Sequence, residues 1–339
     1  MGNRERCLAA IRGDRTDRVP THVSFTPAAA EQAAGWLRVA ASDLPQVLDN
    51  HLITCFVRAI DRTEGNADFD LWGVGWDNTI NDGFQIHVHP LAEMGAVSAY
   101  RCPDPDDPRL YAEVSRVVGE NDGRLAVFGD MGFTLWERYY LLRGFEQAME
   151  DLLTEPALVD DLLDQITETM CGIAAHLVRA GIDVGYTGDD FGSQRGLLFS
   201  PAVWRRFLRP RYERLWSIFR SANMPVCHHS CGDVRAILDE MADIGLDLLC
   251  PVQTQAMPAD ELANRWGHRL AFWGGISTQG VLPFGTREQI LAHIQECRDT
   301  LGRRGRYILG PSHDMTSDVP RDNFFAMLEG MQIEPKRAV

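Results

Sequence analysis

A strand, a polar turn and a helix follow one another in the stretch Met224-Pro225-Val226-Cys227-His228-His229-Ser230-Cys231-Gly232-Asp233-Val234-Arg235-Ala236-Ile237-Leu238. Residues 224–227 predict an apolar strand that is entered through a proline. Residues 233–238 predict the next helix, and the carboxylate of Asp233 is placed to cap its start. The polar turn therefore lies at the C-terminal end of a strand, where an α/β barrel carries its chemistry.

The same order of strand and helix repeats from about residue 124 onward. Strands are expected at 125–130, 182–186, 224–229, 246–250, 270–275 and 307–310. Helices are expected at 156–179, from 233 onward, and at 258–266, 287–301 and 320–331. Repeated strand–helix units predict parallel strands with right-handed crossovers. Their number favours an α/β fold of the (β/α)8 TIM-barrel type over an open sheet.

The first 120 residues follow a less regular pattern. Residues 19–25 predict the first barrel strand. Residues 72–77 and 85–89 alternate like the two strands of a hairpin, which we expect near the barrel mouth. Because no repeat or low-complexity linker interrupts the chain, we expect a single TIM-barrel domain over residues 1–339, with an N-terminal extension and an inserted hairpin.

Composition restricts the partners and the location of the protein. The 339 residues carry a net charge of −15, whereas nucleic-acid binding requires basic patches, so we expect no nucleic-acid partner. No apolar run approaches the roughly 20 residues that cross a bilayer. The first residues also lack the apolar core of a signal peptide. We therefore expect no membrane partner and a cytoplasmic location, with most of the eight scattered cysteines as buried free thiols.

Three residues at strand ends are candidate metal ligands. His229 and Cys231 are two residues apart in an extended segment, so their side chains point to the same side. An imidazole beside a thiolate suits Zn²⁺, although a core histidine next to a core cysteine is the alternative interpretation. His313 follows the last strand and is a third candidate, unless it binds a substrate or caps a helix. Three ligands would leave the open position that a catalytic zinc requires.

Polar residues at the same strand ends are candidate catalytic groups. Asp189 and Asp190 are adjacent carboxylates, and if both are buried one of them has a raised pKa and can act as a general acid. The alternative is a helix cap or a salt bridge to Arg195. Tyr186 and Asp130 end neighbouring strands and complete the catalytic candidates. The candidates for substrate binding are Phe25, Trp72, Trp76, Gln253 and Trp273.

Several motifs, taken in order, indicate a family. The chain opens with Arg4-Glu5-Arg6-Cys7-Leu8-Ala9-Ala10-Ile11-Arg12-Gly13 and Asp17-Arg18-Val19-Pro20. Later motifs are Gly188-Asp189-Asp190-Phe191-Gly192-Ser193-Gln194-Arg195-Gly196 with Ser200-Pro201, Phe272-Trp273-Gly274-Gly275-Ile276, and Gly310-Pro311-Ser312-His313 with Pro320 and Asn323. Over nearly its whole length the chain resembles the uroporphyrinogen decarboxylase superfamily, and more closely its zinc- and corrinoid-dependent methyltransferase branch.

The resemblance implies a corrinoid-linked methyltransferase. Members that serve thiol acceptors are similar at His229-x-Cys231-Gly232, their first two zinc ligands, and have a cysteine as the third ligand where this chain has His313. Fewer thiolates make a stronger Lewis acid, which favours a methyl ether over a thiol. With a histidine at this third position, the chain resembles the O-demethylase methyltransferases. They transfer the methyl group of a small methylated substrate, here a methoxylated aromatic compound for example, to a corrinoid (cobalamin) on a partner corrinoid protein. The resemblance also allows a homodimer.

Two alternatives stay open. The first is a metal-independent decarboxylase of the uroporphyrinogen decarboxylase type, in which Asp130 or Asp189 stabilises a protonated intermediate. True decarboxylases of this family have an Arg-Gln-Ala-Gly-Arg segment for the carboxylates of the substrate, and residues 21–27 lack it. The second alternative is a non-catalytic binding protein on the same barrel.

Overall fold

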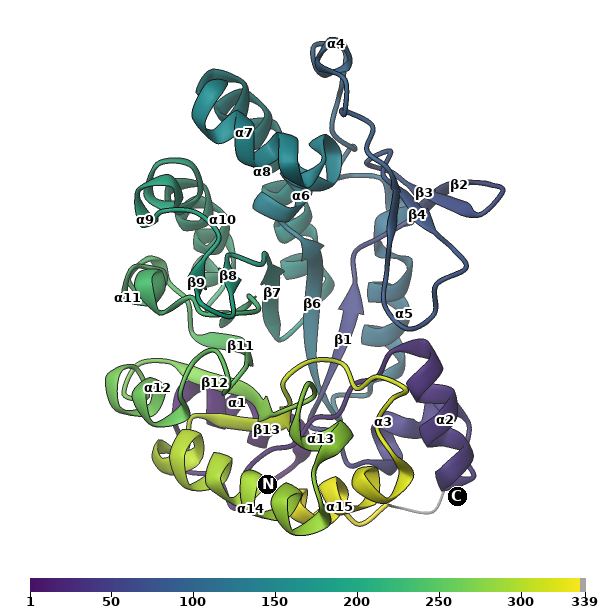
Figure 1. The fold of residues 1–339 in the computed structure, drawn as a ribbon, viewed down its shortest axis with the longest axis vertical. Coiled ribbons are helices and arrows are strands. Elements are labelled where there is room, and N and C mark those ends of the chain that lie inside the picture. Colours follow the sequence, from purple (N-terminus) through teal and green to yellow (C-terminus); the bar gives the residue numbers. More distant parts are fainter. Residues whose placement is uncertain (336–339) are drawn as a thin grey trace.

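The central sheet contains seven parallel strands that neighbour one another in chain order (Figure 1). The computed structural model describes residues 1–335 of the chain. The seven strands are β1 (Leu52–Phe56), β6 (Ala126–Phe133), β7 (Val184–Gly188), β10 (Val226–His229), β11 (Leu248–Val252), β12 (Ala271–Ile276) and β13 (Tyr307–Pro311). Six of them are the strands expected from residue 124 onward, so the alternation of strand and helix is confirmed.

An extended segment at residues 20–25 closes the sheet between β13 and β1. Thr21 forms a parallel bridge with Leu309 of β13. On its other side, the Thr21 carbonyl accepts a hydrogen bond of 3.0 Å from the His51 N–H, just before β1. In place of the strand expected at 19–25, the structure has an extended segment with isolated bridges at Thr21 and Phe25, and the α/β barrel of the sequence analysis is confirmed.

Strand β1 was not predicted, and its burial pattern explains why. Leu52 and Cys55 are buried while Phe56 is exposed, so the apolar positions do not alternate with a period of two. Two buried polar residues, Asn50 and His51, precede the strand and obscure its start. Parallel barrel strands are covered on both faces, so the alternation that marks a half-exposed strand is absent.

Helices cover the outside of the barrel (Figure 1). The helices of seven or more residues are α1 (Asn3–Arg12), α2 (Pro27–Leu37), α5 (Ala112–Glu120), α6 (Trp136–Arg143), α7 (Phe145–Thr154), α8 (Pro156–Ala180), α10 (Arg209–Ser221), α11 (Arg235–Ile244), α12 (Ala259–Arg265), α14 (Arg287–Thr300) and α15 (Arg321–Met331). Shorter elements are α3 (Leu44–Val47), α4 (Met94–Val97), α9 (Pro201–Val203), α13 (Val281–Phe284), η1 (Ala41–Asp43), η2 (Pro108–Tyr111), η3 (Trp204–Leu208), η4 (Leu301–Arg304), β8 (Gly192–Ser193) and β9 (Gly196–Leu197). Over the described part of the chain, no helix is both long and apolar enough to cross a bilayer.

Local residues set the helix ends. Helix α8 starts with Pro156 and stops before Gly181, whose φ of 82° is the left-handed conformation that glycine favours. Helix α14 starts with a capping box between Thr286 and Gln289. The helix expected from Asp233 begins two residues later, at Arg235. The N-cap residue is Val234 and not Asp233, although the Asp233 carboxylate accepts the Arg235 N–H at 3.1 Å.

A four-stranded antiparallel sheet is inserted between β1 and β6, above their C-terminal ends in Figure 1. Its strands are β2 (Ile60–Glu64), β3 (Ala67–Asp70), β4 (Gly75–Asp77) and β5 (Ile86–Val88). The pairing of β4 with β5 confirms the expected hairpin. Strands β2 and β3 were not expected, because every residue of β2 is exposed and the strand has no buried face to mark it.

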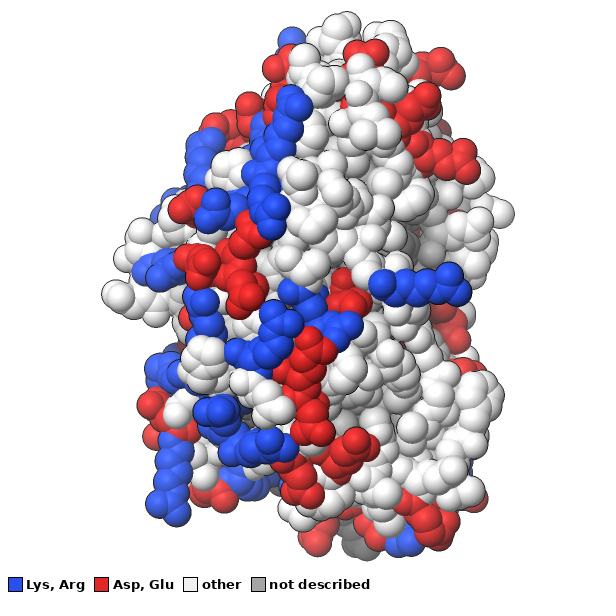
Figure 2. Space-filling model, turned by 60° about the vertical axis from the view of Figure 1, so that its left-hand side comes forward, with Lys and Arg blue, Asp and Glu red and all other residues white. Residues whose placement is uncertain are grey.

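Acidic and basic side chains are mixed on the outer helices. Figure 2 shows Arg side chains interleaved with Asp and Glu along one side of the face drawn, beside a broad uncharged area. The arginines of residues 205–211 are part of this pattern, since Arg205 pairs with Glu240 at 2.8 Å and Arg211 pairs with Asp164 at 2.6 Å. Neighbouring carboxylates therefore neutralise this arginine cluster, as a solvated helix face would require.

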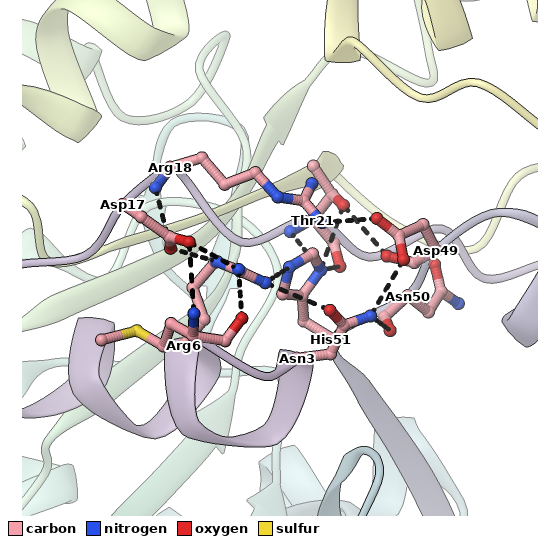
Figure 3. A network of polar contacts seen from close by, with 9 residues as sticks. Asn3, Arg6, Asp17, Arg18, Thr21, Asp49, Asn50 and His51 are labelled. Atoms are coloured by element: carbon pink, nitrogen blue, oxygen red, sulfur yellow. Dashed lines mark hydrogen bonds and ion pairs between the residues drawn. The ribbon is translucent and has the colours of Figure 1, made fainter.

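Helix α1 plugs the bottom of the barrel. Cys7 and Ile11 of this helix pack in one cluster with interior side chains such as Phe128 and Ile308. Beside them, buried Arg6 binds Asp17 at 2.6 Å and the Nε2 atom of buried His51 at 3.0 Å (Figure 3). The opening motif of the chain therefore has a structural role at the end of the barrel opposite the mouth, the end associated with stability.

Replacing Arg6 by methionine is expected to lower the free energy of unfolding by about 2 kcal/mol, because His51 and the helix start lose buried hydrogen bonds. Its partner Asp17 is half exposed, so the ion pair itself adds little. Urea denaturation measures the change. Arg12→Met is the matched control: both partners of the Arg12–Asp14 pair are more than half exposed, so we expect a change within about 0.5 kcal/mol. Equal effects of the two substitutions would contradict the role of Arg6.

Candidate metal centre at the barrel mouth

The turn after β10 is held from both neighbouring strand ends. The Cys231 N–H donates to Asp190 at 2.7 Å, and the Gly232 N–H donates to Gln253 Oε1 at 2.8 Å. Gly232 has a φ of 78°, and a side chain there would collide with the backbone of Gly192. Only glycine satisfies both conditions, so the glycine of the turn is required by its close approach to the loop after β7.

This turn brings two of the candidate ligands together, and the loop after β13 adds the third. His229 Nε2 lies 3.5 Å from the Sγ of Cys231. One donor atom each from His229, Cys231 and His313 can be chosen so that all lie within 4.8 Å of one another. Tetrahedral zinc, with Zn–N near 2.0 Å and Zn–S near 2.3 Å, places its donors about 3.3–3.8 Å apart. The three side chains therefore fit a zinc ion after small rotations, and His313 is exposed, which leaves the site open to the mouth.

The electrostatics of the three side chains favour a thiolate at Cys231 and protonated rings at His229 and His313. Burial raises the pKa of Cys231, but His229 and His313 outweigh burial and the pKa is lowered overall. Burial lowers the pKa of His229, yet the thiols of Cys231 and Cys250 hold it well above its ordinary value. The hydrogen bond with Cys231 raises the pKa of His313. The environment thus stabilises the Cys231 thiolate, which is the form that binds a metal.

The adjacent carboxylates Asp189 and Asp190 have different surroundings. Asp189 is fully buried, and burial raises its pKa to about 6 against the hydrogen bonds it accepts. Those bonds come from the Tyr212 hydroxyl and from the four N–H groups that start α6, namely Thr134 (3.2 Å), Leu135 (2.9 Å), Trp136 (2.7 Å) and Glu137 (2.8 Å). The side chain of Asp190 is 38% exposed and its Oδ1 lies 3.8 Å from His229 Nε2. Asp189 is thus a helix cap, the alternative noted above, and the two carboxylates are not both buried as the general-acid expectation required.

Tyr186 and Asp130 lie in the barrel interior below the three ligands. The Tyr186 hydroxyl is 3.2 Å from His229 Nδ1, on the side of the ring away from Cys231. Tyr186 therefore reaches His229 rather than the open mouth. Asp130 accepts the Gly132 N–H at 2.7 Å, and burial raises its pKa to about 7. Its carboxyl can exchange a proton near neutral pH.

The candidate substrate-binding residues separate into three groups. Trp76 lies at the mouth, stacked on Phe133 of β6 with 5.5 Å between ring centroids. Phe25 and Trp72 have their rings packed against other elements of the protein. Phe25 packs toward Phe324 of the outer helix α15, and buried Trp72 lies under the Arg138 guanidinium. Burial of an aromatic side chain is favourable wherever the core accepts it, so an aromatic residue near a strand end does not by itself indicate a pocket.

Gln253 and Trp273 also have positions that differ from the expected one. The side-chain oxygen of Gln253 accepts a hydrogen bond from the Gly232 N–H, so Gln253 supports the turn that carries the candidate ligands. Trp273 is buried in the barrel interior, edge-on to Phe128 and His22. Gln253 therefore contacts the ligand turn, and Trp273 contacts the side chains of the barrel interior.

Three residues at the mouth were missed by the sequence analysis. Phe133 and Phe84 form an aromatic wall with Trp76, and Phe84 is 59% exposed. Phe133 pairs with Gly188, which in turn pairs with His229, so the wall is two strand spacings, about 10 Å, from the candidate ligands. Glu137 is buried at the start of α6, and burial together with Asp190 and Asp189 raises its pKa to about 8. Neither the loop position of Phe84 nor the helical position of Glu137 carries a signal that sequence patterns could detect.

Known proteins resemble this chain in sequence and in fold. The family model described as uroporphyrinogen decarboxylase (URO-D) matches residues 71–332. A uroporphyrinogen decarboxylase of Thermus thermophilus is 26% identical, with 96% of both chains covered. Methylcobamide:CoM methyltransferase MtaA of Methanosarcina barkeri is 30% identical over 171 residues, which is 50% of this chain and 48% of that protein. Among solved structures, a methyltransferase from Methanosarcina mazei has a TM-score of 0.76 at 20% identity and covers 98% of both chains, so the whole fold is shared.

Proposed function

Because the chain belongs to the uroporphyrinogen decarboxylase family, we propose that it is a methyltransferase that moves a methyl group from a small methylated compound to the cobalt of a corrinoid protein. The observation that carries this proposal is the group formed by His229, Cys231 and His313 at the barrel mouth. The likeness to a methylcobamide methyltransferase over half of the chain supports the corrinoid partner.

The three side chains would hold Zn²⁺, and a zinc ion there supplies a Lewis acid for the oxygen that bears the methyl group. With one thiolate and two neutral imidazoles, the ligands donate less negative charge than a set with two thiolates, which favours polarising an ether oxygen. The methyl group leaves without the electron pair of its C–O bond, so the oxygen gains that pair and needs a proton. Asp190 is half-exposed and lies 3.8 Å from His229, so its carboxyl group is placed to donate that proton to the leaving oxygen.

From the aromatic wall formed by Trp76, Phe84 and Phe133 we infer the chemical class of the substrate. Trp76, Phe84 and Phe133 present apolar surface about two strand spacings from the ligands. A methoxylated aromatic compound could place its ring against this wall and its ether oxygen toward the ligands. The direction of transfer that we propose is from this compound to the corrinoid.

Removing the metal tests the proposal. We expect protein treated with a chelator to lose methyl transfer from a methoxylated aromatic compound to a reduced corrinoid protein by at least about 100-fold, because the leaving oxygen loses its Lewis acid. Added zinc should restore the rate. The absorbance change of cobalt on methylation measures the reaction, and metal analysis gives the zinc content of each sample. Full activity in metal-free protein would contradict the proposal.

The decarboxylase alternative has one observation in its favour, the match of nearly the full chain to uroporphyrinogen decarboxylases. It requires no metal, so the same metal-free protein distinguishes the two functions. We expect no CO2 release from a carboxylated tetrapyrrole with either the zinc-loaded or the metal-free protein. Release from both preparations would favour the decarboxylase.

A further inference from the structure

His229 is contacted on its two ring nitrogens by different groups. Nε2 faces the mouth, 3.5 Å from Cys231 Sγ, and Nδ1 faces the barrel interior, 3.2 Å from the Tyr186 hydroxyl. The same hydroxyl lies 3.5 Å from the Sγ of Cys250, a distance at which sulfur accepts a hydrogen bond. Tyr186 thus bridges the inner nitrogen of a candidate ligand to a buried thiol.

The barrel strands place these three side chains side by side. Tyr186, His229 and Cys250 belong to β7, β10 and β11, which are consecutive in the sheet. His229 is in register with Cys250, and Cys227 on the same strand is in register with Tyr186. Tyr186 and Cys250 are both almost fully buried, so water does not compete for their hydrogen bonds. The contact therefore follows from the strand register and does not depend on a mobile loop.

The ring of Tyr186 is fixed in this orientation by its neighbours. It lies edge-on to Phe128 with 6.2 Å between ring centroids and is tilted against Trp273 at 5.8 Å. A tyrosine ring has few ways to turn inside such a packed interior. Its hydroxyl is therefore held behind His229 whether or not the mouth is occupied.

We propose that Tyr186 is a positioning residue that selects the tautomer and the orientation of His229, with Cys250 as the final acceptor of the chain. This inference rests on the proposed zinc site. When Nε2 offers its lone pair to a metal, the ring proton is on Nδ1, and it is donated to the oxygen of Tyr186. The hydroxyl proton of Tyr186 then points to Cys250 Sγ. In this arrangement the Nε2 lone pair faces the other two ligands.

Tyr186→Phe tests the inference, because it removes the hydroxyl and keeps the ring that packs on Phe128 and Trp273. We expect it to weaken zinc binding by about 10- to 100-fold, the usual effect of losing a group that orients a ligand. Competition with a chromophoric chelator measures the affinity. The absorption bands of the cobalt(II)-loaded protein should also shift, because the His229 ring is no longer held.

The matched control is Tyr307→Phe. Tyr307 is also a buried barrel-strand residue, and its hydroxyl donates to the Gly274 carbonyl at 2.7 Å, away from the ligands. We expect this variant to bind zinc as the unmodified protein does. Cys250→Ala is a second variant that leaves the tyrosine in place but removes a direct hydrogen-bond partner of His229 as well as the acceptor of Tyr186, and we expect it to weaken zinc binding by about tenfold.

The outcomes separate this inference from the proposed function. If the unmodified protein binds zinc through His229 and Tyr186→Phe binds it equally well with unchanged cobalt bands, the positioning role is wrong and the zinc site stands. If the unmodified protein binds no more zinc than His229→Ala, both proposals are wrong. Equal weakening in Tyr186→Phe and Tyr307→Phe would show a general effect on the barrel and would also overturn the inference.

Discussion

Replacing His229 by alanine, or Cys231 by serine, is expected to remove bound zinc and methyl transfer together. Each substitution deletes one of three donors that lie within 4.8 Å of one another. Loss of a direct ligand should weaken zinc binding by more than about 100-fold, the upper end for residues that only support a ligand. Serine is a poor replacement for Cys231, because its hydroxyl stays protonated where the Cys231 thiol has a lowered pKa. Metal analysis after dialysis and the cobalt absorbance assay measure the two losses.

Cys171→Ser is the matched control for Cys231→Ser. Cys171 is a buried free thiol on α8, on the outer layer of the barrel, so the same chemical change is made away from the mouth. We expect this control to keep its zinc and its activity. Zinc content that survives in both His229→Ala and Cys231→Ser would show that the metal, if any, binds elsewhere.

Replacing Asp189 by alanine is expected to cost about 4 kcal/mol of unfolding free energy, a large share of the total for a protein of this kind. The carboxylate accepts four backbone N–H groups at the start of α6 and the Tyr212 hydroxyl. All of these donors are buried around a side chain with no exposed surface, so water does not replace the lost acceptor. Chemical denaturation measures the change. A loss below about 1 kcal/mol would contradict the structural role.

Asp190→Asn is the matched control for this prediction, since the two carboxylates are adjacent. Asp190 is half-exposed, so its replacement by the amide of the same shape should change the unfolding free energy by less than about 1 kcal/mol. Its effect should fall on the methyl-transfer rate, because the proposed proton holder is lost. The pair of variants therefore separates stability from activity at neighbouring positions of one loop.

The residues around His229 illustrate which inferences sequence patterns support. The extended spacing predicts that His229 and Cys231 point to the same side, and His229 Nε2 lies 3.5 Å from the Cys231 Sγ. His228 is buried among Phe191, Tyr212 and Trp216, and its Nδ1 is 2.9 Å from the Thr187 hydroxyl. Burial lowers the pKa of His228 to about 3. The core-histidine interpretation thus applies to His228, one residue away from the candidate ligand.

The sequence by itself determined the alternation of strands and helices from residue 124 onward, the barrel class, and the position of His229, Cys231 and His313 at strand ends. These are local properties, set by periodicity, turn residues and the parallel topology that repeated strand–helix units impose. The tertiary structure decided which of two adjacent aspartates is buried, that the rings of Phe25 and Trp72 pack against Phe324 and Arg138, and that Tyr186 faces His229. These outcomes depend on partners more than 40 positions apart in the chain, such as Asp189 with the start of α6 or Tyr186 with His229. Whether a side chain is buried, and which other side chain it contacts, depends on the neighbours packed around it, and the sequence of a single strand or loop does not specify those neighbours.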